Sequence, residues 1–377
     1  MNFRVQKIVE AVLQHSSRAT PADAVLRAEL KRQSGLPPDL AASAARAVFA
    51  WFRWRGWLDE SQSAAQQAQS ALLLQERYNT RPESFSDEEL LQRTVPSWLS
   101  EQMDIDLAWL RTLQHEPPLW LRARAGKGKE LAAKLGECWI PQGPTLADAV
   151  QYRGREDLFR APEFHAGEFE VQDISSQIVG LACAPKPGET WWDACAGEGG
   201  KTLHLSDLMQ NQGLIWASDR AEWRLKRLKL RAARAKVFNY RSAIWHGGVK
   251  IPTRTKFDGV LLDAPCSGLG TWQRNPHARW TTRPEDVEEL AAVQKQLLRR
   301  VAASVKPGGR LVYAVCTLTR AETGEVAAAF ETEFPQFRKV PLVNPLRPEV
   351  ASQDSLWLWP KDGGNGMFIA AWQRERE

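Results

Sequence analysis

The carboxyl-terminal half of the chain alternates short apolar runs with longer amphipathic stretches. From about Val171 onward, runs of strand length recur at 190–194, 214–218, 257–264, 309–315 and 366–372. Helix-like patterns separate them over 201–210, 220–235 and 284–305. Strands that alternate with helices are typical of a doubly wound parallel sheet. Residues 171–377 are therefore predicted to form a Rossmann-like α/β domain.

A glycine-rich loop follows the first of these strands, in WWDACAGEGGKT (191–202). Gly197, Gly199 and Gly200 let the backbone approach a ligand and turn into a helix amino terminus, but their spacing matches neither the dinucleotide nor the phosphate-loop motif. Asp219 follows the next strand, where an acid in such folds binds ribose hydroxyls. Arg224, little more than one turn later, is placed to reach the same edge. The pattern predicts an adenosine-type ligand without a pyrophosphate, and S-adenosylmethionine is the obvious candidate.

Two cysteines lie just after later strands of this series, Cys266 in DAPCSG and Cys316 in YAVCT. Consecutive parallel strands are usually neighbours, so both thiols are expected to face one crevice beside the glycine loop. A lone cysteine is usually a small buried apolar residue. Two at strand ends indicate covalent chemistry. The five cysteines have irregular spacing and no CxxC pair, so no disulfide scaffold or structural metal site is expected.

Paired thiols suit one reaction that a single thiol does not complete easily. Carbon 5 of a pyrimidine is a poor nucleophile, but a thiolate that adds at carbon 6 makes it reactive toward a sulfonium methyl group. Asp263 is placed to hold the ring-nitrogen and amine edge of such a base. The target base must be unstacked or single-stranded. Spacing alone does not tell which cysteine attacks.

The rest of the chain predicts two further domains. Residues 1–95 follow helix periodicity, and the helix 44–59 (AARAVFAWFRWRGWLD) carries a buried aromatic stripe beside arginines that are either solvated or in contact with phosphates. Residues 96–170 mix short apolar runs with one helix, which indicates a small α+β subdomain. The 17 tryptophans fall mostly on apolar faces, so core packing is their expected role.

Bulk properties narrow the class of protein. The net charge of +5 permits an anionic partner without requiring one. No apolar run has the length of a membrane span, and the amino terminus lacks the pattern of a signal peptide. We expect a cytoplasmic protein, a monomer that does not contact the membrane.

Four segments, in this order, resemble the motif series of the Fmu/Sun family of RNA cytosine-5 methyltransferases. They are VQDISS (171–176), DACAGEGGK (193–201), DAPCSGLGTWQRNPHARW (263–280) and YAVCTLTRAETGEV (313–326). The helix 44–59 is similar to the NusB-like RNA-binding domain of the bacterial small-subunit ribosomal RNA members.

This resemblance implies roles for individual residues. Cys316 is the nucleophile and Cys266 promotes product release. Asp219 holds the cofactor ribose, Asp263 lies at the cofactor and base edge, and Lys201 lies close to the target base. The loop expected to wrap the methionine end of the cofactor comprises Cys195, Ala196, Gly197, Glu198, Gly199, Gly200 and Lys201.

The chain departs from the family pattern at several positions. Gly197-Glu198 replaces the usual Ala-Pro and adds a negative charge beside the cofactor. Segment 243–248 (AIWHGG) lacks the acid that the family places against adenosine, and His246 is its nearest polar substitute. The other departures are Val315 for Thr, Thr323 for Asn and Arg124 for Asn.

The leading hypothesis is an S-adenosylmethionine-dependent RNA cytosine-5 methyltransferase that acts on ribosomal RNA. A second is an RNA-binding or ribosome-assembly factor that no longer turns over, and a third is the same chemistry on transfer RNA. A DNA cytosine methyltransferase is disfavoured because there the cysteine after proline attacks, which leaves Cys316 without a role.

Overall fold

The computed structural model describes residues 1–33 and 35–376. Contacts divide them into two compact units, one made of 1–117 with 268–286 and the other of 118–267 with 287–377. Segment 268–286 directly follows the Cys266 loop in the chain, yet it packs with the amino-terminal residues. The hydrophobic pattern of the sequence gives no sign of this assignment.

The first unit is helical. Its elements are α1 (Phe3–His15), α2 (Ala22–Arg32), α3 (Pro38–Trp54), η1 (Arg55–Trp57), α4 (Ala64–Thr80), η2 (Pro82–Ser84), α5 (Asp87–Arg93), α6 (Leu99–Gln102), α7 (Leu107–Thr112), η4 (Leu269–Thr271) and α13 (Pro276–Thr281). Capping boxes begin α4 at Ser63 and α5 at Ser86, where each serine accepts a hydrogen bond from the N3 backbone N–H. These side chains satisfy amide groups that the first helical turn leaves without partners.

Helix periodicity builds the core of this unit. Val5, Ile8, Val9 and Val12 of α1 are buried against α2 and α3, as their spacing predicts. A second cluster packs aromatic rings around Trp54, whose centroid lies 5.5 Å from Tyr78 and 5.1 Å from Phe85.

The second unit holds two sheets. The smaller has the order β2-β3-β1-β4, and each neighbouring pair is antiparallel. Its elements are β1 (Leu119–Ala123), α8 (Gly128–Leu135), β2 (Cys138–Trp139), β3 (Ala149–Tyr152), η3 (Leu158–Arg160), α9 (Pro162–His165) and β4 (Phe169–Val171).

The larger sheet has the order β10-β12-β9-β8-β5-β6-β7, with β11 paired to β12. Its elements are α10 (Ile174–Cys183), β5 (Thr190–Asp193), α11 (Gly200–Leu208), β6 (Leu214–Asp219), α12 (Glu222–Arg234), β7 (Tyr240–Ile244), β8 (Phe257–Asp263), α14 (Pro284–Ala302), β9 (Val305–Val315), α15 (Gly324–Glu333), β10 (Phe337–Lys339), β11 (Ser355–Leu358), η5 (Pro360–Asp362) and β12 (Met367–Arg374). Strands β5 to β9 are parallel, whereas β12 runs antiparallel to β9. The expectation of a parallel sheet is therefore wrong for the last strand, and the sheet is mixed.

The order of the strands reverses beside β5. The chain runs from β5 outward through β6 to β7, then returns to β8 on the other side of β5. In such sheets ligands bind outside the carboxyl ends of the strands at this switch point. The loops that follow β5 and β8 contain the glycines and Cys266.

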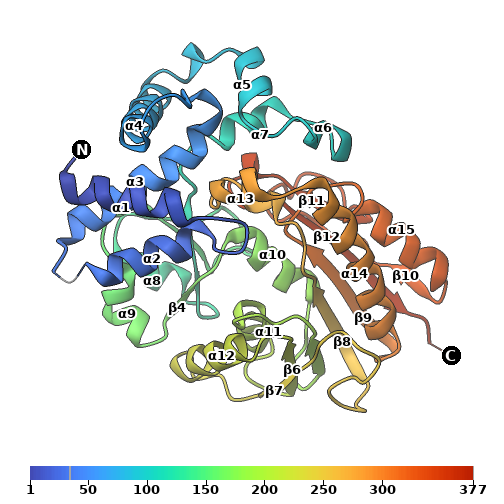
Figure 1. The fold of residues 1–377 in the computed structure, drawn as a ribbon. Helices are drawn as coiled ribbons and strands as arrows, with labels where there is room; N and C mark the ends of the chain where they lie inside the picture. The colour runs from blue at the N-terminus through green and yellow to red at the C-terminus, as the bar shows by residue number, and fades with distance from the viewer. Residues whose placement is uncertain (34, 377) are drawn as a thin grey trace. The chain divides into compact units, whose positions relative to one another are not determined.

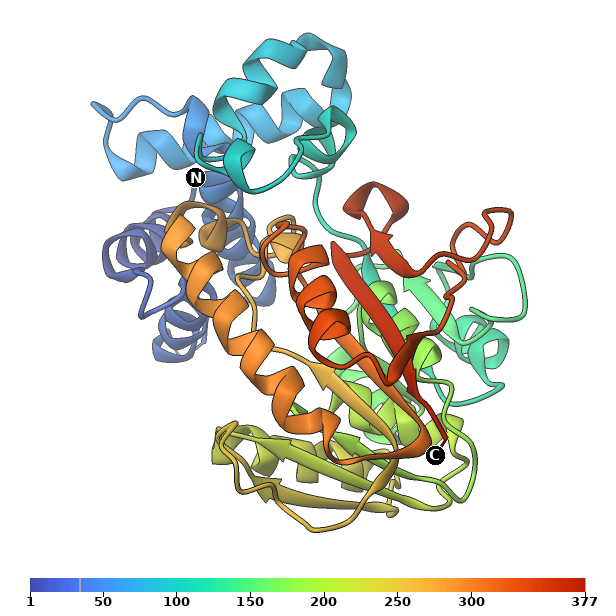
Figure 2. The same ribbon diagram turned by 90° about the vertical axis from the view of Figure 1, so that its right-hand side faces the viewer.

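Helices cover both faces of the large sheet (Figures 1 and 2). Side chains of α14 and α15 pack on one face, and α10 packs on the other against β9 and β12. Alternate residues of one strand serve the two layers, since Trp192 faces the α14 side and Trp191 the α10 side. Both rings are buried, as expected for tryptophans on apolar faces.

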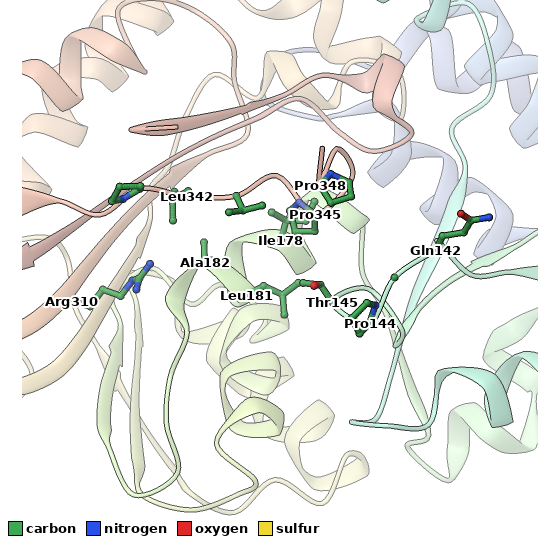
Figure 3. Close-up of a pocket in the computed structure, with 13 residues that line it drawn as sticks. Gln142, Pro144, Thr145, Ile178, Leu181, Ala182, Arg310, Leu342, Pro345 and Pro348 are labelled. Atoms are coloured by element: carbon green, nitrogen blue, oxygen red, sulfur yellow. The ribbon is translucent and has the colours of Figure 1, made fainter. Parts of the chain in front are cut away.

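A mostly apolar cavity of about 310 Å³ lies between α10 and the proline-rich loop after β10. Figure 3 shows Ile178, Leu181 and Ala182 on one side of it and Leu342 on the other. Arg310 lines one end, level with Gly259 near the start of β8. This cavity is thus separate from the carboxyl ends of the strands. No helix in the described part of the chain is long and apolar enough to span a membrane.

Candidate active site

The loop from Cys195 to Gly200 turns tightly from β5 into α11. Gly199 has φ +86°, and a Cβ there would lie 2.6 Å from Cγ of Leu228, so only glycine fits. Gly197 has φ +54° with open space beside it. Its backbone N–H donates to Oδ2 of Asp219 over 3.0 Å. The glycines thus leave room for a ligand at Gly197 while α12 closes the loop at Gly199.

Asp219 ends β6 with 5% of its surface exposed. Besides Gly197, the N–H of Ala221 donates to its Oδ1 over 2.8 Å. Arg224 Nη1 lies 3.8 Å from Oδ2, as its spacing suggests. Arg227 Nη1 lies 3.5 Å from Oε1 of Glu198, so a neighbouring cation balances the negative charge that distinguishes this loop.

Acidic side chains gather around the glycine loop. Burial raises the pKa of the Cys195 thiol, and the carboxylates of Asp193, Asp263 and Asp219 raise it further. Asp193 accepts a 2.6 Å hydrogen bond from Thr202, but its buried Oδ1 has no partner. Three acidic groups around one glycine loop disfavour a phosphate and are compatible with a sulfonium-bearing nucleoside such as S-adenosylmethionine.

His246 lies in the exposed loop that follows β7. The N–H of the preceding residue, Trp245, donates to the backbone oxygen of Asp219 over 3.1 Å, which ties this loop to the cofactor edge. Ile244 is paired in register with Asp219. The segment supplies backbone close to Asp219, and the polar role of His246 toward adenosine stays a prediction.

The two thiols lie together. β8 and β9 are neighbouring parallel strands, with Asp263 opposite Ala314, and Cys266 Sγ lies 3.3 Å from Cys316 Sγ. The two thiols are adjacent, as the strand order predicts, and the crevice beside the glycine loop stays a prediction. The hydrogen bond with Cys316, together with burial, raises the pKa of Cys266 well above its ordinary value. Cys266 therefore keeps its proton and can donate it toward Cys316.

Lys201 connects the glycine loop to the thiols. Its Nζ donates to Oδ2 of Asp263 over 2.7 Å. Burial acts to lower the pKa of Lys201, but the charge and hydrogen bond of Asp263 outweigh it, and Cys316 adds to the rise. The result is a cation held close to the thiol of Cys316, where it favours a thiolate.

A buried carboxylate that the sequence analysis did not single out joins the two cysteine loops. Oε1 of Glu322 accepts from the N–H of Ser267 over 2.8 Å and from Gln294 over 3.0 Å. Its Oε2 accepts from the hydroxyls of Ser267, Thr317 and Thr319. Ser267 adjoins Cys266 and Thr317 adjoins Cys316, so this one carboxylate positions both loops.

Asp193 predicts a pH dependence of stability. Burial raises its pKa to about 7, whereas an unfolded aspartate has a pKa of about 3.9. Between these values the folded protein binds more protons than the unfolded chain, so stability falls as pH rises, by on the order of 4 kcal/mol in total. Urea unfolding at pH 5 and pH 8 measures this slope, which Asp193→Asn is expected to flatten. Equal slopes in both proteins would show that Asp193 does not titrate in this range.

The sequence carries a weak signal for one of the missed residues and none for the other. Asp193 is an acid at the end of a predicted strand, a position that itself suggests a ligand. Glu322 lies in an irregular segment, and only the tertiary structure brings Ser267 and Gln294 to it.

Arg124, a departure from the family pattern, pairs with Asp207 over 2.5 Å.

The strand order, with a glycine loop at its switch point, defines a Rossmann-like α/β fold. Residues 180–373, about half of the chain, match the family described as 16S rRNA methyltransferase RsmB/F. The chain belongs to this family, in agreement with the resemblance in its motifs.

Known proteins similar to this chain agree with that assignment. It is 36% identical over 271 residues to the protein named "Probable ribosomal RNA small subunit methyltransferase B" from Synechocystis sp., covering 66% of this chain and 59% of that one. It spans between half and two thirds of the length of such relatives.

Two crystal structures share the fold. PH0851 is 22% identical, with a TM-score of 0.81 and 99% of both chains covered. A methyltransferase homolog protein from Pyrococcus horikoshii is 27% identical, with a TM-score of 0.60, covering 71% of this chain and 90% of that one.

Proposed function

We propose that this protein transfers a methyl group from S-adenosylmethionine to carbon 5 of a cytosine in ribosomal RNA, through a covalent adduct at carbon 6. The observation that carries the proposal is the 3.3 Å separation of Cys266 and Cys316 beside the glycine loop. Membership of the RsmB/F family and the names of the curated relatives support RNA, and ribosomal RNA in particular, as the substrate.

The residues of the loop after β5 fit the cofactor. When bound, S-adenosylmethionine supplies an electrophilic methyl group on a sulfonium. Asp219 is the ribose anchor, and its carboxylate also orders the loop through the N–H of Gly197. The buried Oδ1 of Asp193 has no partner, and this carboxyl group lies close enough to Cys195 to affect its thiol, where the methionine end is expected.

Cys316 is proposed as the nucleophile. The ammonium group of Lys201 and the protonated Cys266 both favour its thiolate form. Its sulfur adds to carbon 6 of the cytosine, while Asp263 hydrogen-bonds the ring-nitrogen and amine edge. Carbon 5 is then electron-rich, and its electron pair would form the bond to the methyl group as the bond from that methyl to the sulfonium breaks and a neutral thioether leaves.

Release requires two bonds to break. The proton on carbon 5 passes to solvent water as the base, and the pair of electrons freed there re-forms the double bond between carbons 5 and 6 and expels the Cys316 thiolate. Cys266 lies against the bond that breaks, so it is the group placed to assist this step. Glu322 keeps the two loops in register throughout.

Bisulfite sequencing of total RNA tests the function directly. A strain that lacks the gene is compared with its parent and with the same strain complemented by Cys316→Ala. We expect one methylcytosine of ribosomal RNA to be lost in the strain that lacks the gene. It should be restored by the wild-type gene and not by Cys316→Ala. Loss from a transfer RNA instead would redirect the substrate, and an unchanged profile would refute the reaction.

Asp219 is expected to dominate affinity for the cofactor. Asp219→Ala removes the ribose acceptor and frees the N–H of Gly197, so the Kd for S-adenosylmethionine should rise about 10- to 100-fold. Isothermal titration calorimetry measures this. Asp354→Asn, a carboxylate whose nearest cation is Lys339 at 3.5 Å, is the control and should bind normally. If Asp219→Ala also binds normally, the ribose assignment is wrong.

The same titration separates enzyme from assembly factor. The hypothesis of an RNA-binding or assembly factor without turnover rests on two departures from the family pattern. These are Glu198 in the glycine loop and the missing acid near His246. Because Glu198 pairs with Arg227, the first departure gives this hypothesis less support. If the protein does not bind S-adenosylmethionine even with RNA present, the hypothesis of an assembly factor is favoured.

A further inference from the structure

A cavity of about 640 Å³ opens within the helical unit. Helices α2 and α3 line it together with the chain before β1 and the residues around η4, and all of these belong to residues 1–117 and 268–286. Three arginines line its wall, Arg46 and Arg53 from α3 and Arg274 from the segment that follows Cys266.

Among the described residues, none of these guanidinium groups forms a close ion pair with a carboxylate. Arg53 is 3% exposed; one of its nitrogens donates to Gln75 over 2.9 Å, and its Nε has no partner. Burial lowers the pKa of Arg53 to about 10, against the opposing attraction of the Glu116 carboxylate. Arg46 reaches only the hydroxyl of Ser43, at 3.5 Å. Among the described residues, none of the three arginines has a carboxylate oxygen within 4 Å, so an anion in the cavity would be the missing partner.

The rest of the cavity wall can contact a base and a ribose as well as an anion. The half-buried ring of Phe49 gives a face on which a base can stack. Asp23 and Glu116 also line the cavity and can accept hydrogen bonds from a ribose 2′-hydroxyl or a base amine. The volume lies in the range of small-molecule sites and exceeds what one phosphate fills.

We propose that this cavity binds one nucleotide of a single-stranded RNA, with its phosphate held by Arg46 and Arg274 above the buried Arg53. This deepens the proposed function and rests on it, because it assigns part of the RNA footprint. The nucleotide is distinct from the target cytosine.

Two residues that line the cavity follow Cys266 closely in the sequence. Thr271 and Arg274 come a few residues after Cys266, and the segment that carries them is anchored in the helical unit. Arg279 donates to the backbone oxygens of Arg53, Thr94 and Leu113 over 3.3, 3.1 and 3.0 Å, and Trp280 Nε1 donates to that of Phe52 over 2.6 Å. Arg274 therefore lies on a segment held firmly within the helical unit.

Fluorescence anisotropy with a labelled, cytidine-rich single-stranded RNA of about 12 nucleotides tests the proposal. The full-length double variant R46Q/R274Q is compared with R4Q/R32Q, which removes the same charge from exposed positions of the same unit. We expect R46Q/R274Q to bind about 10- to 100-fold more weakly, with the slope of log Kd against log salt reduced by about one to two. R4Q/R32Q should change either quantity little.

Two outcomes overturn the proposal. One is equal affinity and equal salt slope in the two double variants. The other is displacement of the RNA by millimolar inorganic phosphate at constant ionic strength, which would make the cavity a site for free phosphate. Methyl transfer is measured on the same samples. An inactive wild-type protein that still shows the difference in binding contradicts the proposed function and leaves this site standing.

Discussion

Cys316→Ala is expected to abolish methyl transfer, and Cys266→Ala is expected to trap the protein on its RNA. The first change removes the sulfur that adds to carbon 6, so activity should fall by at least about 10³-fold. The second leaves that sulfur in place but removes the group 3.3 Å away that assists its expulsion. Incubation with RNA and S-adenosylmethionine, followed by denaturing electrophoresis, should show a covalent protein–RNA band with Cys266→Ala alone.

Two controls sharpen this result. Cys138→Ala changes a partly buried thiol on β2 of the small sheet and should keep full activity without a trapped band. The double variant of Cys266 and Cys316 should form no adduct. A covalent band with Cys316→Ala would reverse the roles of the two cysteines, and full activity of Cys316→Ala would exclude it as the nucleophile.

The periodic elements of the large sheet were predictable because packing repeats along the sequence. The apolar runs at 190–194 and 257–264 are β5 and β8, and the amphipathic run at 284–305 contains α14. Strand β7 was not predicted from the sequence. It lies at the edge of the sheet, where Arg241 and Ser242 face solvent and the apolar pattern is lost. The antiparallel direction of β12 also has no signature in its own residues.

In the candidate site too, one feature was predictable from the sequence and another was not. The adjacency of the thiols followed from a topological rule, and the structure confirms it. The role of Glu322 did not follow from any rule, because its partners come from three separate segments. A buried carboxylate becomes interpretable only when its hydrogen bonds are known.

The cations of the basic helix α12 can face solvent, contact RNA or pair with other parts of the fold. In the structure Arg231 and Arg234 both pair with the buried carboxylate of Glu170, over 2.9 and 2.6 Å. Arg227 pairs with Glu198. These cations hold the small sheet and the glycine loop, which leaves fewer of them for an RNA partner.

Glu322 predicts the largest loss of stability. Glu322→Ala removes the acceptor for the N–H of Ser267, the amide of Gln294 and three hydroxyl groups, all in a site with no exposed carboxylate surface. Leaving such donors unsatisfied costs about 1–3 kcal/mol each where they find no substitute, so a loss of about 3–5 kcal/mol is expected. Urea unfolding measures it, and Glu325→Gln, an exposed neighbour in the first turn of α15, should be neutral.

A second measurement separates positioning of the thiols from mere support of the fold. The negative charge of Glu322 contributes, after the hydrogen bond with Cys316 and burial, to the raised pKa of Cys266. Glu322→Gln removes that charge but keeps the size of the side chain, so the pKa of Cys266 should fall. The rate of Cys266 alkylation by iodoacetamide, followed by peptide mass spectrometry against pH, should then rise at lower pH than in the wild type. An unchanged profile in a folded Glu322→Gln protein would confine Glu322 to a structural role, because a carboxylate that tunes the thiols cannot be neutralised without shifting their titration.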